Sequence, residues 1–291
     1  MDEEEIASVA ADLRDAVVVT GTGPVGNAAA ARVRERDALE PTAATVPDSA
    51  RAVLAAVDPA DPSPAVALAE RCDPETLVVF VAAVPERPEA GARTALATLH
   101  EAADTVVLVP DRGDAAAATA TGLDTLVRLV GGSDSVNVDL ADVETTVAAG
   151  GFAAVGTATD ADATAAALDA LDACGPVSLA RATGALVHLD GGSGLTVADA
   201  GEAVAAVRDA LAGGSHVIWG AATDGDDDAT TVRVVLAGVV PVRPPPEAGD
   251  DCPRCGATLV AYRMGDRETV ACDGCGFADV AAALGGELGR D

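Results

Sequence analysis

The sequence predicts an α/β protein organised around a parallel sheet, followed by a smaller α+β unit and a C-terminal module built on cysteines. Short β-branched runs alternate with alanine-rich helical stretches in the first half, which is typical of parallel sheets. The run Leu77 to Val84 is apolar throughout, as expected for a strand covered on both faces. Two CxxC pairs, Cys252–Cys255 and Cys272–Cys275, define the third part.

The first half reads as a strand, a glycine turn and a helix, and then as further strands and helices. The strand Ala16 to Thr20 enters the turn Gly21 to Asn27, and an alanine-rich helix follows. The apolar stretch Val53 to Val57 ends in Asp58 to Pro64, where three prolines oppose helix formation. The other expected strands are 43–46, 77–84 and 105–109, and the other expected helices are 65–72, 93–102 and 114–130.

The second half changes character, because its strands no longer alternate regularly with helices. This order predicts a smaller α+β unit with a mixed sheet. The stretch Val242 to Asp251 contains three consecutive prolines and predicts an extended linker. The expected strands are 152–157, 184–189, 216–222 and 230–237, and the expected helices are 162–174 and 197–211.

The chain is strongly acidic. Its 291 residues include 47 acidic and 18 basic side chains, for a net charge of −29, and every basic residue is arginine. Acids spread along the whole chain indicate a halophilic protein, because concentrated salt screens the self-repulsion. The charge argues against nucleic-acid binding, which needs a basic surface. No apolar run is long enough to span a bilayer and the start, Met1 to Glu5, is acidic, so we expect a cytoplasmic protein.

The cysteines predict a metal site. Cys252, Cys255, Cys272 and Cys275 form two pairs with 16 residues between them, a spacing that fits a tetrahedral zinc ribbon. Bound zinc would let so short a module fold without a large core. Because all four positions are cysteine, we expect a structural Zn²⁺. The ribbon's few arginines, Arg254, Arg263 and Arg267, lie among acids, so we expect it to contact protein instead of nucleic acid. A chance pattern or a redox pair is the alternative.

A series of motifs in the second half carries a family resemblance. Asn137 to Val143 reads NVDLADV, Gly156 follows it, and Gly184 to Gly192 is a strand that ends in a glycine turn. Leu195-Thr196-Val197 begins the next helix, and two more strands follow. In this order the motifs resemble those of the FtsZ/tubulin superfamily, with its archaeal FtsZ/CetZ-like members, across roughly residues 15 to 240.

The resemblance implies a tubulin/FtsZ-like fold and a division of the chain. It implies a shortened, degenerate GTPase-type domain at 15–143 and an FtsZ-like C-terminal α+β domain at 144–241. Composition divides the rest into an acidic extension at 1–14, the proline-rich linker at 242–251, the zinc ribbon at 252–278 and an acidic tail at 279–291. In the family, the loop matching Asn137, Asp139 and Asp142 completes the GTP site of the adjacent subunit. These three residues are therefore the catalytic candidates, acting on a neighbour.

The nucleotide site departs from the family pattern. Gly21, Gly23, Gly26 and Asn27 match the family's first phosphate loop, where backbone N–H groups and a helix N-terminus face a phosphate. The family's glycine- and threonine-rich loop GGGTGTG is replaced by Asp58 to Pro64, whose prolines remove N–H donors and whose aspartates repel a triphosphate. In an ungapped count from Asn137, the guanine-reading Asn and Asp of the family correspond to Ala116 and Ala117. These departures predict lost or weakened binding of GTP and Mg²⁺.

Each candidate site has an alternative interpretation. The glycines at positions 21, 23 and 26 also fit a tight strand–helix turn without a ligand, or a Rossmann-type NAD(P) site with Asp48 as the ribose-binding acid. Asn137, Asp139 and Asp142 also fit simple helix capping.

We therefore expect a divergent FtsZ/tubulin-like scaffold or modulator, related to the cytoskeleton or to cell division. It would act on FtsZ/tubulin-like subunits, either copies of itself or paralogues, and would not be an enzyme in its own right. The alternatives are an active FtsZ/CetZ-like GTPase with an altered site and an NAD(P)-binding enzyme.

Overall fold

The computed structural model of the chain divides into two compact units, residues 1–242 and residues 243–291. The residues that the structure describes are 17–37, 46–47, 49–85, 90–131, 138, 140–147, 151–175, 177–211, 213–223, 225, 228–239, 246–252, 254–264 and 267–278. Within these ranges no helix is long and apolar enough to cross a bilayer.

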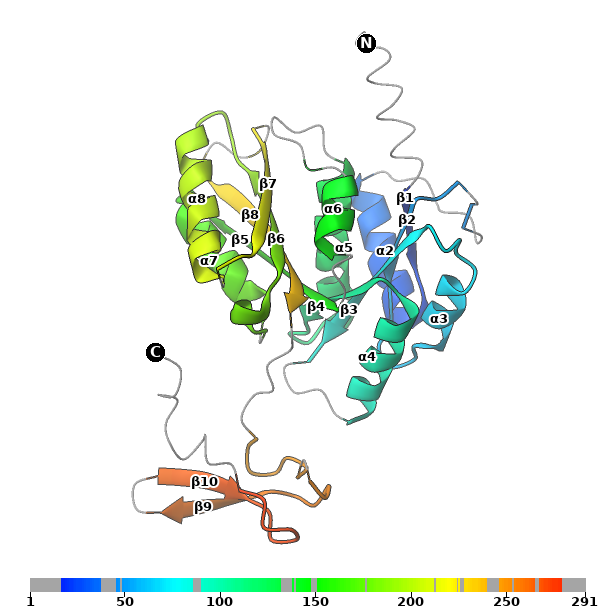
Figure 1. Cartoon of the computed structure of the whole chain (residues 1–291), viewed down its shortest axis with the longest axis vertical. Coiled ribbons are helices and arrows are strands. Elements are labelled where there is room, and N and C mark those ends of the chain that lie inside the picture. The colour runs from blue at the N-terminus through cyan, green and yellow to red at the C-terminus, as the bar shows by residue number, and fades with distance from the viewer. Residues whose placement is uncertain are drawn as a thin grey trace. The chain divides into compact units, whose positions relative to one another are not determined.

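The first unit is built on one eight-stranded sheet with the strand order β1-β2-β3-β4-β5-β8-β6-β7 (Figure 1). Its first half contributes four parallel strands with their helices. The strands are β1 (Val17–Gly21), β2 (Ala52–Ala56), β3 (Leu77–Val84) and β4 (Thr105–Pro110). The helices are α2 (Gly23–Asp37), α3 (Ser63–Ala69), α4 (Ala90–Ala102), α5 (Ala115–Gly131) and α6 (Leu140–Val147).

The second half extends the same sheet in a mixed pattern. Strand β8 lies between β5 and β6 and is antiparallel to both, whereas β6 and β7 are parallel. Strand β5 also runs parallel to β4 over a short stretch that joins the two halves. The strands are β5 (Phe152–Asp160), β6 (Gly184–Asp190), β7 (His216–Ala222) and β8 (Thr230–Val239), and the helices are α7 (Ala163–Ala173), α8 (Val197–Ala210) and the 3₁₀ turn η1 (Leu179–Arg181).

Three apolar clusters hold the layers of this unit together. The first joins one face of the sheet to α2, α5 and α6, because the leucines at positions 123, 126 and 129 give α5 a buried stripe of helical spacing. The second packs α7 and α8 on β5 to β8, and the third packs α3 and α4 on the opposite face of β2 to β4. Strand β3 contributes Val79 and Val81 to the first cluster and Phe80 to the third, as the alternation of a strand requires.

The second unit contains a two-stranded antiparallel sheet, β9 (Val260–Met264) and β10 (Arg267–Ala271). Its small core consists of Cys252, Leu259, Val270 and Cys272. The described part of this unit therefore buries few apolar side chains.

The fold class predicted from the sequence is confirmed, including the mixed sheet of the second half. The predicted strands at 77–84 and 216–222 match β3 and β7 in their bounds. The predicted boundary between residues 143 and 144 falls inside α6, and the subdivision at this point stays a prediction.

Two local predictions need correction. Of the predicted strand 43–46, residues 43–45 lie outside the described residues, and Val46 is not in a strand; the apolar stretch 53–57 overlaps β2 instead. Helix α3 begins at Ser63, within the proline segment where we expected no helix. Pro64 is tolerated because it occupies the first turn, where its missing N–H has no intrahelical acceptor.

Candidate functional site

The glycine loop lies at the carboxyl end of β1, and its glycines allow contacts within the protein itself. A Cβ at Gly21 would lie 2.2 Å from the carbonyl oxygen of Gly26, and a Cβ at Gly26 would lie 2.2 Å from that of Ala56 at the end of β2. The N–H of Thr22 donates to the same Ala56 oxygen at 2.9 Å. The close approach of backbone to backbone therefore requires glycine here even without a ligand.

The remaining glycine of the loop, Gly23, faces the loop between β2 and α3. Gly23 has φ +69°, and a Cβ at this position would lie 2.7 Å from the Cβ of Asp58. Asp58 is 9% exposed, so a nearly buried carboxylate lies beside the N-terminus of α2, where the family would place a phosphate. Asn27, the last residue of the loop motif, is exposed on α2.

The loop Asp58 to Pro64 uses its N–H groups internally. The N–H of Ala60 donates to Asp58 Oδ1 at 3.0 Å, and that of Ser63 donates to Asp61 Oδ1 at 3.2 Å. The N–H of Asp61 donates to the carbonyl oxygen of Asp58 at 3.2 Å. Since the three prolines have no N–H and the N–H groups of Ala60, Asp61 and Ser63 are engaged, few donors of this loop remain to wrap a phosphate.

The N-terminus of α5 carries the two positions that the sequence predicts to correspond to the family's base-reading residues. Ala116 and Ala117 present only methyl groups there, and the N–H of Ala117 donates to Asp114 Oδ1 at 2.9 Å. This hydrogen bond, followed by the nearby Arg32 guanidinium, lowers the pKa of Asp114. Nη2 of Arg32 lies 3.4 Å from Oδ2 of Asp114, and this ion pair links α2 to the start of α5. Asp114 is thus a helix cap, with a role that needs no base.

The candidate catalytic loop is described in part. Asn137 and Asp139 lie outside the described residues, whereas Asp142 lies in the first turn of α6 and is half-buried. Val138 and Val143 are fully buried and fix this segment to the core. Of the three candidates, the structure therefore locates Asp142 alone.

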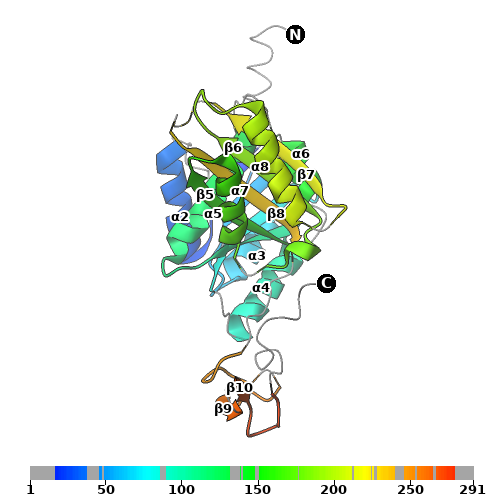
Figure 2. The same cartoon turned by 90° about the vertical axis from the view of Figure 1, so that its left-hand side faces the viewer.

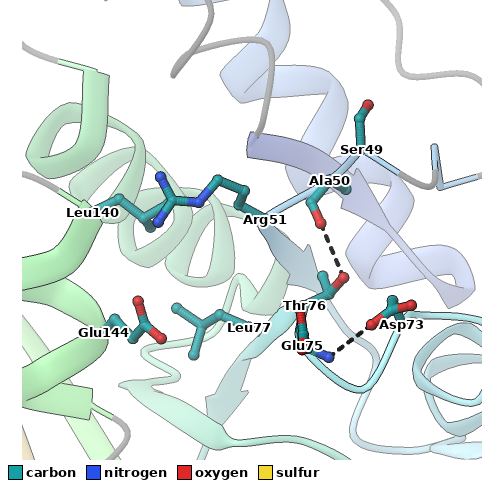
Figure 3. Close-up of a pocket in the computed structure, with 9 residues that line it drawn as sticks. All are labelled: Ser49, Ala50, Arg51, Asp73, Glu75, Thr76, Leu77, Leu140 and Glu144. Atoms are coloured by element: carbon teal, nitrogen blue, oxygen red, sulfur yellow. Dashed lines mark hydrogen bonds between the residues drawn. The ribbon is translucent and has the colours of Figure 1, made fainter.

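A cavity of about 410 Å³ lies beside α6, and sequence reasoning missed it (Figure 3). Leu140 and Glu144 of α6 line it together with Leu77, the first residue of β3, and with residues that precede β2 and β3: Ser49, Ala50, Arg51, Asp73, Glu75 and Thr76. Because these residues precede parallel strands, α6 lies at the amino edge of the sheet. No sequence signal could have revealed the cavity, since its walls come from three distant segments.

The glycine loop follows β1 and therefore lies at the carboxyl edge, opposite α6. Two candidate sites at opposite edges of one sheet cannot form one catalytic centre within a single chain. They are compatible with a head-to-tail arrangement of subunits.

The four cysteines of the ribbon converge in the second unit. Their Sγ atoms all lie within 4.8 Å of one another, with 3.6 Å between Cys252 and Cys275 and 3.5 Å between Cys255 and Cys272. Four sulfurs around a tetrahedral Zn²⁺ lie about 3.8 Å apart, given a Zn–S distance of about 2.3 Å. The donor set and its spacing therefore fit zinc.

Two matching turns shape this cluster. The N–H of Gly256 donates to Cys252 O and the N–H of Gly276 donates to Cys272 O, both at 2.9 Å, and the glycines have φ +74° and +72°. Burial raises the pKa of the Cys252 thiol, but N–H groups of Arg254 and Cys255 and the neighbouring thiols outweigh this and lower it to about 7. The N–H of Ala257 lowers the pKa of Cys255, but its hydrogen bonds with the other thiols outweigh this and raise it to about 12, so without a metal the cluster favours one thiolate. A thiolate is the form that binds a metal.

Comparisons with known proteins agree with the fold and with the second half. Residues 146–240 match the family model described as FtsZ family, C-terminal domain. The chain is similar to cell division protein FtsZ 1 of Methanocaldococcus jannaschii, with 37% identity over 116 residues, which cover 38% of this chain and 31% of the relative. It is also similar to cell division protein FtsZ 1 of Halobacterium salinarum, with 29% identity over 203 residues, which cover 61% of this chain and 51% of the relative.

Solved structures show the same fold. A point mutant of FtsZ from M. jannaschii superimposes with a TM-score of 0.62 at 18% identity, covering 81% of this chain and 96% of that chain. The GTPγS-bound protofilament of CetZ2 from Haloferax volcanii gives a TM-score of 0.53 at 21% identity, covering 74% of each chain. The fold is thus that of a tubulin-type α/β protein. With the sequence matches of its second half, the chain belongs to the FtsZ/tubulin superfamily, and it spans about a third to a half of the length of the curated relatives.

Proposed function

We propose that this protein is an FtsZ/tubulin-type cytoskeletal or cell-division subunit that does not hold a nucleotide of its own tightly. The observation that carries the proposal is the loop Asp58 to Pro64, which lies beside the glycine loop. The N–H groups of Ala60, Asp61 and Ser63 are engaged within the loop, and a nearly buried carboxylate, Asp58, stands beside the N-terminus of α2. A triphosphate there would meet negative charge instead of donors.

The experiment is a calorimetric titration of the full chain with GTP and Mg²⁺ in concentrated KCl, with a GTP-binding FtsZ as the positive control. We expect no saturable heat and no rise in the melting temperature, because a ligand stabilises a protein only when its concentration exceeds its dissociation constant. Micromolar or tighter binding would sink the proposal.

An altered GTP site is the second candidate, and one observation favours it. The hydroxyl oxygen of Thr22, inside the glycine loop, is buried and has no hydrogen-bond partner among the described residues. If GTP does bind, Thr22→Val should weaken its binding, whereas Thr20→Val, two residues earlier and on β1, should not. The same titration with NAD⁺ and NADP⁺ tests the dinucleotide alternative, whose acidic residue Asp48 lies outside the described residues.

The face that carries Asp142 is proposed to dock on an FtsZ-type neighbour and to alter its GTP turnover or filament length. The position of α6 at the edge opposite the glycine loop supports this arrangement. Mixing the protein with an assembling FtsZ should change the rate of GTP hydrolysis, and Asp142→Asn should abolish the change. Glu144→Gln, which removes an exposed charge from the same helix, is the matched control. Equal effects of both variants would leave no role for Asp142.

The cysteine cluster is proposed to hold one structural Zn²⁺ per chain. All four ligand positions are sulfur, so no coordination position is left for a substrate. The protein purified without chelator should contain about one equivalent of zinc, which Cys272→Ser should remove, whereas Cys72→Ser in the first unit should not. A zinc content unaffected by Cys272→Ser would contradict the proposal.

A further inference from the structure

Strand β7 forms one end of the eight-stranded sheet, and β6 is its only strand neighbour among the described residues. The views agree on this position, since β7 lies in front of the first unit in Figure 1 and at its right-hand border in Figure 2. An end strand exposes one row of backbone N–H and C=O groups, which can pair with another strand.

Two hydrogen bonds identify the outward row. The N–H of His216 donates to Thr183 O, and the carbonyl oxygen of Ala222 accepts from the N–H of Gly191, both at 3.2 Å and both on the β6 side. Because peptide groups alternate in direction along a strand, the N–H and C=O groups of Val217, Trp219 and Ala221 point away from β6. No hydrogen bond to these outward groups is found within the part of the chain that the structure describes.

Strand β7 lacks the features that usually protect an edge. Its sequence, HVIWGAA, contains no proline and no acidic or basic residue apart from His216, and its pairing with β6 is continuous. Val217, Ile218 and Trp219 are apolar and only half-buried. In a chain with a net charge of −29, this neutral apolar edge is a surface that two copies can bring together without direct repulsion.

We propose that β7 pairs with β7 of a second copy, antiparallel and about a twofold axis at Trp219. The axis places Trp219 opposite its own copy and Val217 opposite Ala221 of the other copy. Because the peptide groups of these residues point outward, each outward N–H of one copy faces an outward C=O of the other copy. In an antiparallel pair, residues opposite each other in this way exchange both hydrogen bonds.

Side-chain size supports this register. Ile218 lies opposite Gly220, Val217 opposite Ala221 and His216 opposite Ala222, so each bulky side chain other than Trp219 faces a small one across the axis. The two Trp219 rings lie in neighbouring positions at the centre, where cross-strand aromatic contacts add stability. A register shifted by one residue would oppose outward groups to inward ones and lose these hydrogen bonds.

Charge supports the antiparallel direction. The segment that follows β7, residues 224–228, reads DGDDD, whereas the segment that precedes it, residues 211–215, has no charge. An antiparallel pair keeps the carboxyl ends of the two β7 strands, after which the acidic sequence follows, at opposite ends of the pair. A parallel pair would bring these two carboxyl ends together, so charge favours the antiparallel direction.

The single tryptophan of the chain, Trp219, lies on the proposed axis and reports on it directly. The mass of the full chain is measured by light scattering over a range of concentrations in concentrated KCl, together with its tryptophan emission. We expect a dimer of twice 28.5 kDa and a blue shift of the emission as the dimer forms. A monomer at the highest soluble concentration, or a dimer that leaves the emission unchanged, would overturn the proposal.

Variants at Val217 separate pairing from folding. Val217→Pro removes an outward N–H and leaves the bonds to β6, and Val217→Lys adds a charge to the edge. Each should raise the dimer dissociation constant about tenfold or more, whereas Val217→Thr, which keeps the shape and the N–H, should not. Circular dichroism identifies any variant that fails to fold. If the proline variant fails to fold, the lysine variant still tests the pairing. A dimer that survives both folded variants would show that a different surface is used. No nucleotide takes part, so these outcomes are independent of the proposed function.

Discussion

In both halves of the first unit a glycine lets two backbone segments come into contact, but the match to the FtsZ C-terminal family model lies in the second half. In the second half, a Cβ at Gly156 of β5 would lie 1.8 Å from the carbonyl oxygen of Ala170 of α7, so the glycine lets helix and strand touch. In the first half, Gly26 makes the same kind of contact with Ala56. The second half matches the FtsZ C-terminal family model, whereas the sequence predicts that the nucleotide loops of the first half depart from the family pattern.

The glycine contacts of the first half need no ligand to explain them. The contact between Gly26 and the end of β2 holds β1, α2 and β2 together whether or not a phosphate is present. A glycine-rich turn in the sequence is therefore compatible with both a binding site and a packing contact. The β2–α3 loop favours packing, because the N–H groups of Ala60, Asp61 and Ser63 are engaged within it.

The largest expected effect is at Gly156. Gly156→Ala forces a methyl group against the backbone of α7, which cannot move aside as a flexible side chain could. We expect the free energy of unfolding to fall by at least about 3 kcal/mol in urea denaturation. Gly201→Ala, at an exposed position of α8 with open space, should instead raise it by about 0.5–1 kcal/mol. Similar effects of the two substitutions would refute the contact.

Gly26→Ala tests the first half directly. If Gly26 serves packing, the variant should lose about 2–3 kcal/mol of stability without any nucleotide present, because its Cβ would meet Ala56 O at 2.2 Å. Asn27→Ala, at the exposed next position, should change stability by less than about 0.5 kcal/mol. A Gly26→Ala variant as stable as the wild type would mean that the glycine is kept for a ligand.

Arg233 tests the junction of the halves. It lies on β8 with Nη1 3.5 Å from Asp190 Oδ2, and burial, together with Arg128 of α5, lowers its pKa, whereas Asp190 and Asp124 oppose this shift. Arg233→Met should cost about 2 kcal/mol, because it leaves a partly buried Asp190 without its cation. Adding Asp190→Asn should recover part of the loss in the same denaturation assay. No recovery would indicate that Asp190 is stabilised by other groups.

The smallest expected effect is at the N-terminus of α8. Thr196 and Asp199 form a reciprocal capping box, so Thr196→Ala should cost about 1 kcal/mol at neutral pH and Thr196→Ser should cost less. The hydrogen bond from the Thr196 hydroxyl, and then that from its N–H, lowers the pKa of Asp199. A lowered folded-state pKa means that the stabilisation is present at neutral pH and is lost as the pH falls through that pKa. The difference between variant and wild type should therefore shrink in acid, and a constant difference would contradict the role of Asp199.

Much of the first unit could be predicted from local pattern. The strand predicted from the continuous apolar run 77–84 and the helix predicted at 162–174 match β3 and α7 closely in their ends. The strand predicted at 43–46 shows the limit of prediction from local pattern, because a short β-branched run gives no information on whether a neighbouring strand is there to pair with it. Strand β2 formed from the next apolar stretch, where both neighbours, β1 and β3, were available.

The sequence by itself determined the alternation of strands and helices, the paired cysteines and the absence of a GGGTGTG segment, because each is encoded by residues close together in the chain. Tertiary structure decided that Asp58 lies against Gly23, that β8 lies between β5 and β6, and that β7 is left at the end of the sheet. It also brought three distant segments together around the cavity beside α6. Strand order and such contacts depend on packing between residues far apart in sequence, and local periodicity carries no information about that packing.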